Sequence, residues 1–245
     1  MIFETLILPL ALAAQAAPSP PPPPPPPRPA PRFSAPPPPP PLPLPPPVPL
    51  DANAPDTRPY VALVTDVGTI VVRLEDRRAP VTAKNFLRYV DGKRMDGFSF
   101  YRTTRSWGPG SKLVQAGNRG DARKNYPPIV HEATNVTGLT NCDGALSMAR
   151  LRPGDATTDF FILLSPIPGF DANPAGQGDN AGFAVFGEIV AGRDVAEKIY
   201  ALPVSETAGA GVMKGQMIQP PVKIVSARRV PAPAEAPKGC VVKAP

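Results

Sequence analysis

The sequence predicts a mainly β fold, a closed eight-stranded antiparallel barrel capped by two helices and preceded by a disordered, proline-rich segment. Eight short runs of β-branched and aromatic residues are punctuated by glycine and proline, which is typical of all-β folds. Closing the sheet into a barrel removes exposed strand edges. Two stretches between these runs carry apolar residues at helical spacing. Of the 40 prolines among 245 residues, twenty-two fall between Pro18 and Pro49, where neither a helix nor a sheet can form.

The first 16 residues are expected to be a signal peptide that is removed on export. The apolar run Leu6–Ala14 ends in Ala14-Gln15-Ala16, a small-residue cleavage pattern. The run is shorter than the ~20 residues that cross a bilayer, so we expect no stable membrane insertion. Glu4 and the lack of Lys and Arg before the run depart from the usual pattern. Despite this departure, the apolar run and its cleavage pattern lead us to expect a periplasmic or secreted protein.

Residues 17–58 are expected to form a disordered, proline-rich linker. Proline fixes φ and removes an N–H donor, so polyproline II is the regular structure open to Ser19–Leu50. At ~3.1 Å per residue this stretch reaches on the order of 100 Å when fully stiff. It is either a spacer without a binding role, or a semi-rigid stalk or a ligand for aromatic grooves.

The barrel is expected over residues 59–231, followed by a flexible tail at 232–245. Its first two strands form a hairpin around Val67-Gly68. The eight predicted strands, in chain order, are Val61–Thr65, Thr69–Leu74, Phe98–Tyr101, Leu113–Ala116, Ala145–Ala149, Phe160–Leu164, Phe183–Ile189 and Val222–Arg228.

Two helices are predicted between these strands. Pro80 opens the first, since proline suits the first helical turn, and Asp91-Gly92 ends it. The second covers Arg193–Ala201 and follows the helix breaker Gly192. In the barrel these helices are expected to close its open ends.

Composition excludes several classes of function. A single histidine, His131, and two cysteines are too few for zinc fingers, iron–sulfur clusters or His-rich sites, so we expect no metal and no cofactor. The net charge of +6 is spread along the chain, with Arg28 and Arg32 outside the barrel. Such diffuse charge favours solubility over nucleic-acid binding, and we expect a monomer that does not bind nucleic acid.

The two cysteines leave two alternatives open. An even count in an exported chain favours a disulfide between Cys142 and Cys240, which would fasten the tail to the barrel. The alternative is that Cys142 is a small buried apolar residue and Cys240 is free. A disulfide requires Cα atoms within ~7 Å, and no pattern places the tail there.

Five motifs from Tyr60 to Val230 resemble the cyclophilin family of peptidyl-prolyl cis-trans isomerases, in the same order and at nearly the same spacing. They look more like the bacterial periplasmic branch than the eukaryotic cytosolic one. The motifs are Phe100-Tyr101-Arg102, Val114–Gly117 with Gly120-Asp121, Gly144–Arg150, Phe160-Phe161-Ile162 and Phe183–Gly187.

The resemblance implies a site for proline-containing polypeptides. Arg102 falls on the family's catalytic arginine, and Gln115 on the glutamine near the substrate backbone. The remaining positions are substrate-binding: Leu113, Phe161, Phe170 and Phe183 fall on the proline pocket, and Ala149, Arg150 and Leu151 on the strand that pairs with the substrate.

The sequence departs from the family pattern at two candidate positions. An insertion follows Arg102 where the aromatic pocket wall belongs, and Trp107 is the aromatic residue available there, either as the wall or as loop packing. Asp159 replaces the usual glutamine. A carboxylate beside the pocket is expected to disfavour an acidic residue before the proline.

We expect an enzyme that isomerises X–Pro bonds in exported proteins and assists their folding. One alternative is a catalytically weak cyclophilin-fold module that binds proline-containing segments. Another is a surface stalk whose proline-rich segment is the functional part. Retention of Arg102 favours the enzyme, because its charged planar donor suits a twisted amide.

Overall fold

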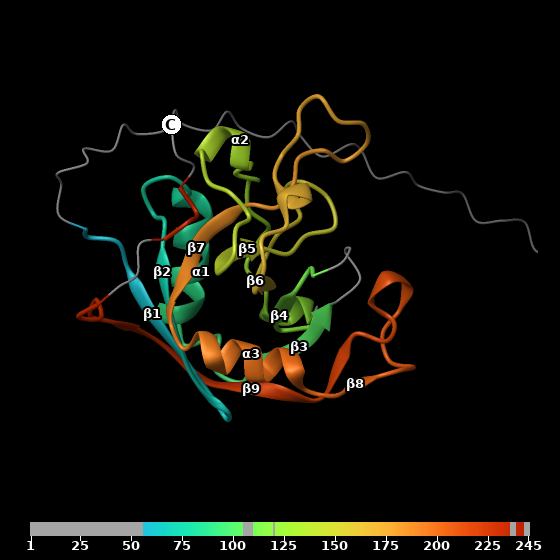
Figure 1. Cartoon of the computed structure of the whole chain (residues 1–245). Coiled ribbons are helices and arrows are strands. Elements are labelled where there is room, and N and C mark those ends of the chain that lie inside the picture. Colours follow the sequence, from blue (N-terminus) through green and yellow to red (C-terminus); the bar gives the residue numbers. More distant parts are fainter. Residues whose placement is uncertain (1–55, 105–109, 120, 236–238, 243–245) are drawn as a thin grey trace, which may run out of the picture. The chain divides into compact units, whose positions relative to one another are not determined.

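The computed structural model describes residues 56–104, 110–119, 121–235 and 239–242. The expected signal peptide, nearly all of the expected linker and the candidate Trp107 lie outside these residues. The described residues form a closed antiparallel barrel (Figure 1), which confirms the predicted fold class.

Eight strands close the barrel in the order β1-β2-β7-β5-β6-β4-β3-β9, and β9 pairs back to β1. The two-residue β8 is an additional strand that pairs with one end of β9. The strands are β1 (Tyr60–Thr65), β2 (Gly68–Leu74), β3 (Ser99–Thr104), β4 (Leu113–Gly117), β5 (Ala145–Met148), β6 (Phe160–Leu163), β7 (Val185–Ala191), β8 (Val204–Ser205) and β9 (Met217–Val230).

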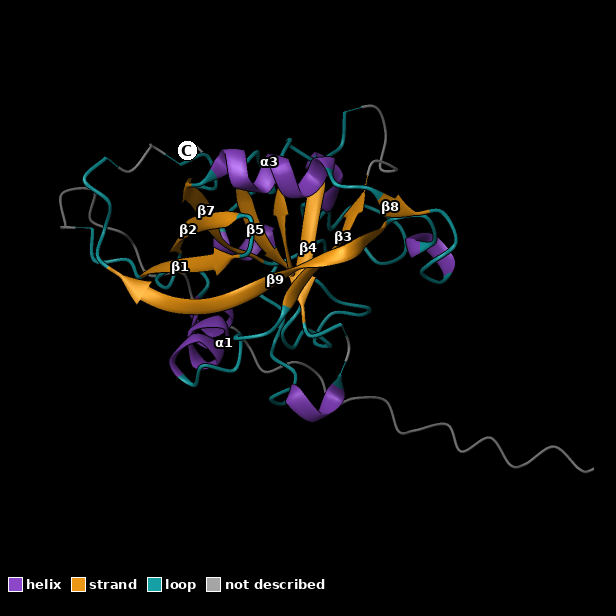
Figure 2. Cartoon of the chain, turned by 90° about the horizontal axis from the view of Figure 1, so that it is seen from below, coloured by secondary structure: helices purple, strands orange, loops and turns teal. Residues whose placement is uncertain are grey.

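Two helices lie at opposite ends of the barrel (Figure 2). These are α1 (Pro80–Asp91) and α3 (Arg193–Ala201), and the second has the predicted bounds. A four-residue helix, α2 (Thr134–Thr137), was not predicted. Three 3₁₀ turns complete the helical structure of the described residues: η1 (Ala122–Lys124), η2 (Pro168–Phe170) and η3 (Gly211–Met213).

The start of α1 is capped by a residue far away in the chain. The buried carboxylate of Glu132 accepts hydrogen bonds from the backbone N–H groups of Val81 and Thr82, at 3.1 and 2.8 Å, and from the Thr82 hydroxyl at 2.6 Å. The two backbone N–H groups are among the donors that a helix leaves unpaired in its first turn. The negative charge of the carboxylate also interacts favourably with the positive end of the helix dipole.

Aromatic rings fill the end of the barrel that α1 covers. Phe86 of α1 packs against Phe160 of β6 and Phe186 of β7, with ring centroids 5.3 Å apart in both pairs. All three side chains are buried. Alternate residues of β1 contribute Val61 and Leu63 to the same core, as a half-buried strand requires.

The end of the chain is fastened to the barrel. Cys142 and Cys240 form a disulfide with Cα atoms 6.1 Å apart, which decides between the two alternatives for the cysteines. Val241 is fully buried, and its carbonyl accepts a hydrogen bond of 2.8 Å from the Thr140 N–H. Within the expected flexible tail, the disulfide and the buried valine hold residues 239–242 against the barrel, while the bounds and flexibility of the whole tail stay a prediction.

Within the described ranges, none of the helices combines the length and the apolar character needed to cross a membrane.

Candidate active site

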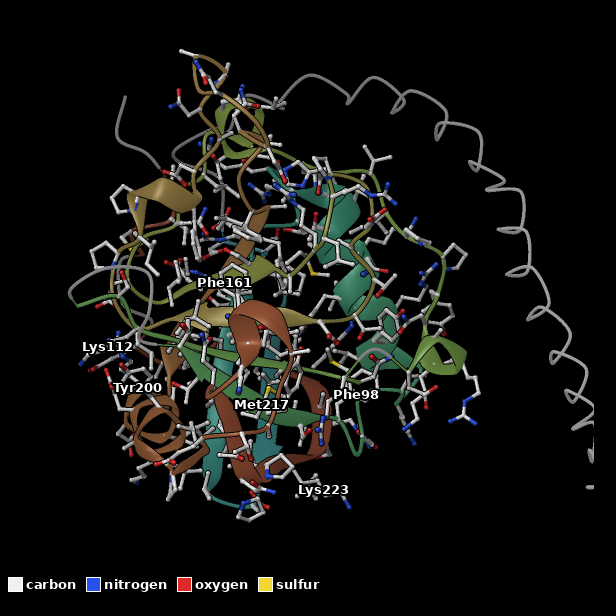
Figure 3. The ribbon with its side chains drawn as sticks, turned by 90° about the vertical axis from the view of Figure 1, so that its right-hand side faces the viewer. Phe98, Lys112, Phe161, Tyr200, Met217 and Lys223 are labelled. Carbon is white, nitrogen blue, oxygen red and sulfur yellow. A yellow bond between two sulfur atoms is a disulfide. The ribbon has the colours of Figure 1, made fainter. Side chains whose placement is uncertain are left out.

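A pocket of about 620 Å³ opens on the wall of the barrel and brings together ten of the eleven residues proposed from the sequence. Figure 3 looks onto this region, with Phe161 and Met217 of the pocket lining labelled. The ten residues are Arg102, Leu113, Gln115, Ala149, Arg150, Leu151, Asp159, Phe161, Phe170 and Phe183. The eleventh, Trp107, lies outside the described residues. The positions agree with a common site, while the role of each residue stays a prediction.

Three aromatic rings form an apolar surface in the pocket. Phe161 of β6 contacts Phe170 and Phe183, with centroids 5.6 and 5.3 Å apart, and the last two rings are 4.7 Å apart. The backbone supports this cluster, since the Phe183 N–H donates to the Phe170 carbonyl at 2.8 Å. Leu113 of β4 is buried beside these rings in the lining. Such a surface is suited to an apolar ring such as that of proline.

Arg102 lies on β3, and its guanidinium is held by two glutamines. Nη1 donates to Oε1 of Gln115 at 2.8 Å. Nε and Nη2 both donate to Oε1 of Gln216, at 2.9 and 2.8 Å. Burial lowers the pKa of Arg102, but the high ordinary pKa of arginine keeps the group charged at neutral pH. The pocket therefore holds an oriented cation with no carboxylate among these partners.

Asp159 lines the pocket, but both of its carboxylate oxygens are engaged by the protein. Oδ2 accepts the hydroxyl of Tyr101 at 2.9 Å. Oδ1 accepts the Asn118 N–H and the Thr158 hydroxyl, each at 3.0 Å. Burial raises the pKa of Asp159, and these hydrogen bonds oppose the rise. The expectation that Asp159 disfavours acidic substrates stays a prediction.

Residues 149–151 follow β5 rather than extend it, since the strand ends at Met148. The Ala149 N–H donates to the Asp159 carbonyl at 2.8 Å. The Arg150 side chain is almost fully buried, pairs with Asp179 at 2.6 Å and lies over the Phe183 ring. It thus supports the aromatic cluster from the loop side. Leu151 is 88% exposed, an apolar side chain free to contact a ligand.

Sequence reasoning missed the wall on the C-terminal side of the pocket. Val212 and Met213 of η3, with Met217 at the start of β9, line it, and Gln216 holds Arg102. These residues carry no local motif. Met217 reaches the site because it pairs with Arg102 in the β3–β9 register, a contact between residues more than a hundred positions apart.

The comparisons with known proteins agree with this geometry. The family model of "Cyclophilin type peptidyl-prolyl cis-trans isomerase/CLD" matches residues 60–229. Peptidyl-prolyl cis-trans isomerase A of Dickeya dadantii is 39% identical over 151 residues, 60% of this chain and 74% of that protein. A peptidyl-prolyl cis-trans isomerase of Acinetobacter baylyi is 35% identical over 170 residues, 68% of this chain and 82% of that protein.

A solved structure supports the fold alone. A cyclophilin-type peptidyl-prolyl cis-trans isomerase of Cryptosporidium parvum superposes with a TM-score of 0.54 at 18% identity, covering 72% of this chain and 99% of that one. The match of the family model spans most of the barrel and includes the residues of the pocket from Tyr101 to Met217. The chain therefore belongs to the family of cyclophilin-type peptidyl-prolyl cis-trans isomerases.

Proposed function

We propose that this peptidyl-prolyl cis-trans isomerase acts on X–Pro bonds of exported polypeptides and assists their folding, with Arg102 as its catalytic residue. The observation that carries the proposal is the oriented guanidinium beside an apolar pocket. X–Pro isomerisation crosses a barrier of ~18–20 kcal/mol and takes about 10–100 s unaided, so it limits the folding of many chains.

The chemistry needs no covalent step. In the transition state the amide is twisted, and the nitrogen lone pair no longer conjugates with the carbonyl. A guanidinium has five N–H groups, and the two glutamines engage three of those of Arg102. The remaining two, which no described residue accepts in a hydrogen bond, are available to the lone pair or to the carbonyl oxygen.

Arg102 alone does not account for an efficient enzyme. An acceleration of about 10⁵ requires ~7 kcal/mol, whereas one charge-assisted hydrogen bond contributes ~1.5–3 kcal/mol. The aromatic cluster of Phe161, Phe170 and Phe183 supplies the complement by holding the proline ring while the flanking backbone rotates. The low-polarity surroundings also favour the twisted amide, whose carbonyl dipole is smaller than that of the planar form.

A protease-coupled peptide isomerisation assay on the purified chain tests this proposal. We expect Arg102→Ala to lower kcat/KM at least tenfold, because it removes the charged donor beside the twisted amide. Thermal stability is expected to change little, since the guanidinium is held by two neutral glutamines and its burial is costly. Arg123→Ala is the matched control, since Arg123 is exposed and outside the pocket. Equal activity of wild type and Arg102→Ala contradicts the role of Arg102.

The same assay separates the enzyme from a binding module. A catalytically weak module binds a proline-containing peptide without accelerating its isomerisation. Wild-type protein that binds the peptide but leaves the isomerisation rate at its uncatalysed value therefore contradicts the proposed function.

The proposed export rests on two features. The apolar run Leu6–Ala14 with its cleavage pattern is one. The Cys142–Cys240 disulfide is the other, because such bonds persist in oxidising compartments. We expect cell fractionation to recover the chain outside the cytosol with Ala17 as its first residue. Recovery in the cytosol with residues 1–16 retained contradicts export and leaves the isomerase activity untouched.

A further inference from the structure

Four side chains form a continuous hydrogen-bonded chain from the catalytic centre to Asp159. Nη1 of Arg102 donates to Oε1 of Gln115 at 2.8 Å. Nε2 of Gln115 donates to the Tyr101 hydroxyl at 2.6 Å, and that hydroxyl donates to Oδ2 of Asp159 at 2.9 Å. The four residues come from β3, β4 and the residue before β6, which are neighbours in the barrel.

The two ends of this chain dictate its direction. A guanidinium only donates hydrogen bonds, and an ionised carboxylate only accepts them. The Tyr101 hydroxyl must therefore donate to Asp159 and accept from Gln115. The Gln115 amide is then left with one orientation, with its oxygen toward Arg102 and its nitrogen toward Tyr101. Arg102 by itself requires the Gln115 oxygen to face it, and Asp159 adds the second anchor, because a hydroxyl that donates to Asp159 keeps its oxygen available to accept from the Gln115 nitrogen.

Neighbouring residues hold the Asp159 carboxylate in place. Its Oδ1 accepts the Asn118 N–H and the Thr158 hydroxyl, which leaves Oδ2 for Tyr101. Gly117 makes room for it, because a Cβ at that position would lie 1.8 Å from Oδ1. Gly117 also has φ of +150°, in a region that side-chain-bearing residues seldom adopt. The carboxylate is thus seated by contacts on both of its oxygens.

We propose that Tyr101 and Asp159 are positioning residues, which fix the orientation of the Gln115 amide and through it hold the Arg102 guanidinium toward the substrate. The inference rests on the proposed function, since it assigns Arg102 the catalytic role. Neither residue needs to touch the reacting amide. Their effect is on the fraction of time that Arg102 spends in a productive orientation, and so on kcat.

The test is a double-mutant cycle of Tyr101→Phe and Asp159→Asn in the full chain. Each variant interrupts the hydrogen-bonded chain at a different link while nearly keeping the side-chain volume. We expect each to lower kcat about three- to tenfold, the effect of losing one orienting hydrogen bond. The double variant is expected to have a kcat no lower than that of the less active single variant, because both substitutions interrupt the same series of hydrogen bonds.

Tyr89→Phe is the matched control. Tyr89 is also buried, and its hydroxyl accepts a backbone hydrogen bond of 2.5 Å from Tyr126, but it lies outside the pocket. Its loss is expected to lower thermal stability and to leave kcat within twofold. NMR gives a second measurement, in which the side-chain NH₂ signal of Gln115 shifts in Tyr101→Phe and Asp159→Asn and stays in place in Tyr89→Phe.

Two results overturn the inference. One is a kcat within twofold of wild type in both Tyr101→Phe and Asp159→Asn, and the other is a double variant whose loss equals the product of the two single losses. Both results count only if the wild-type protein is active in the same assay. An inactive wild type contradicts the proposed function instead, and in that case the NMR signal of Gln115 still reports whether Tyr101 and Asp159 orient the amide.

Discussion

Among single residues, Arg102 depends on a partner that no motif indicates. Gln216 accepts two hydrogen bonds from the guanidinium through one oxygen, and its Nε2 donates to the Val212 carbonyl at 2.6 Å. This second bond connects Arg102 to η3, whose Val212 and Met213 line the pocket. Gln216 therefore ties the Arg102 side chain to the wall of the pocket.

We expect Gln216→Met to lower kcat about fivefold, because it keeps the length of the side chain and removes the oxygen that accepts from Arg102. Gln216→Glu retains an acceptor and is expected to recover most of the activity. The measurement is the coupled peptide assay, with Gln177→Met, an exposed residue outside the pocket, as the control. Full activity in Gln216→Met would show that Gln115 alone orients Arg102.

The sequence predicts some residues of the pocket and misses others. The family resemblance points to ten pocket residues from Arg102 to Phe183, because its motifs fix short stretches around the strands, whereas Asn118, Arg119, Asp155 and Thr157 of the same lining were not predicted. Gln216 and Met217 were not predicted either, since their place beside Arg102 follows from the β3–β9 register. Register is a property of two distant strands, and neither strand encodes it alone.

At the scale of elements, periodic sequence patterns predict the centres of the helices and strands well and their ends poorly. Both long helices and all eight barrel strands are found. However, β9 has 14 residues and begins at Met217, five residues before the predicted start. Strand β7 begins at Val185, because Phe183 turns its ring into the pocket instead of continuing the ladder. Four-residue α2 is too short to show a helical period.

The disulfide is the element-scale feature with a direct test. It joins residues 98 positions apart, so closing this loop contributes up to ~4–5 kcal/mol in the chain-entropy model. We expect reduction to lower the free energy of unfolding by about 2–4 kcal/mol. Isomerase activity is expected to remain within twofold, because residues 239–242 lie outside the pocket lining.

Urea unfolding with and without reductant measures the effect, and the Cys142→Ser/Cys240→Ser double variant is the control that reductant leaves unchanged. Thiol labelling of the denatured chain is expected to modify two cysteines after reduction and none before. Two reactive thiols in unreduced protein from an oxidising compartment, or an unfolding free energy that reductant does not alter, would contradict this prediction.

At the scale of the whole domain, local sequence patterns do not determine whether the strands close into a barrel. Eight strands of suitable length are compatible with a sandwich as well as a barrel. The pairing of β1 with β9 closes the ring, and it joins residues near the two ends of the domain, such as Tyr60 and Val230. The sequence favours closure because a barrel leaves no exposed strand edge, and the family resemblance implies the same fold, but no single strand indicates it.

The single histidine gives the folded domain a predictable response to pH. His131 is half-buried, and its Nε2 lies 2.9 Å from the Ala181 carbonyl, to which it donates as the neutral N–H tautomer or as the cation. Burial is the main cause that lowers the pKa of His131, Arg150 lowers it further, and Asp179 together with the bond to Ala181 opposes the shift. The unfolded chain keeps the ordinary pKa of about 6.5.

We therefore expect the contribution of neutral His131 to stability to be complete above about pH 6.5 and to be lost as the pH falls through the lowered pKa, because the unfolded chain binds the proton first. His131→Gln keeps an N–H donor for Ala181 and does not titrate. Urea unfolding at pH 7.5 and 5.0 is expected to show a larger loss of unfolding free energy in wild type than in His131→Gln. Carboxylates titrate in both proteins and cancel in the comparison. An equal loss in the two proteins, or an NMR titration of the folded protein that places the pKa of His131 above 6.5, would contradict this assignment.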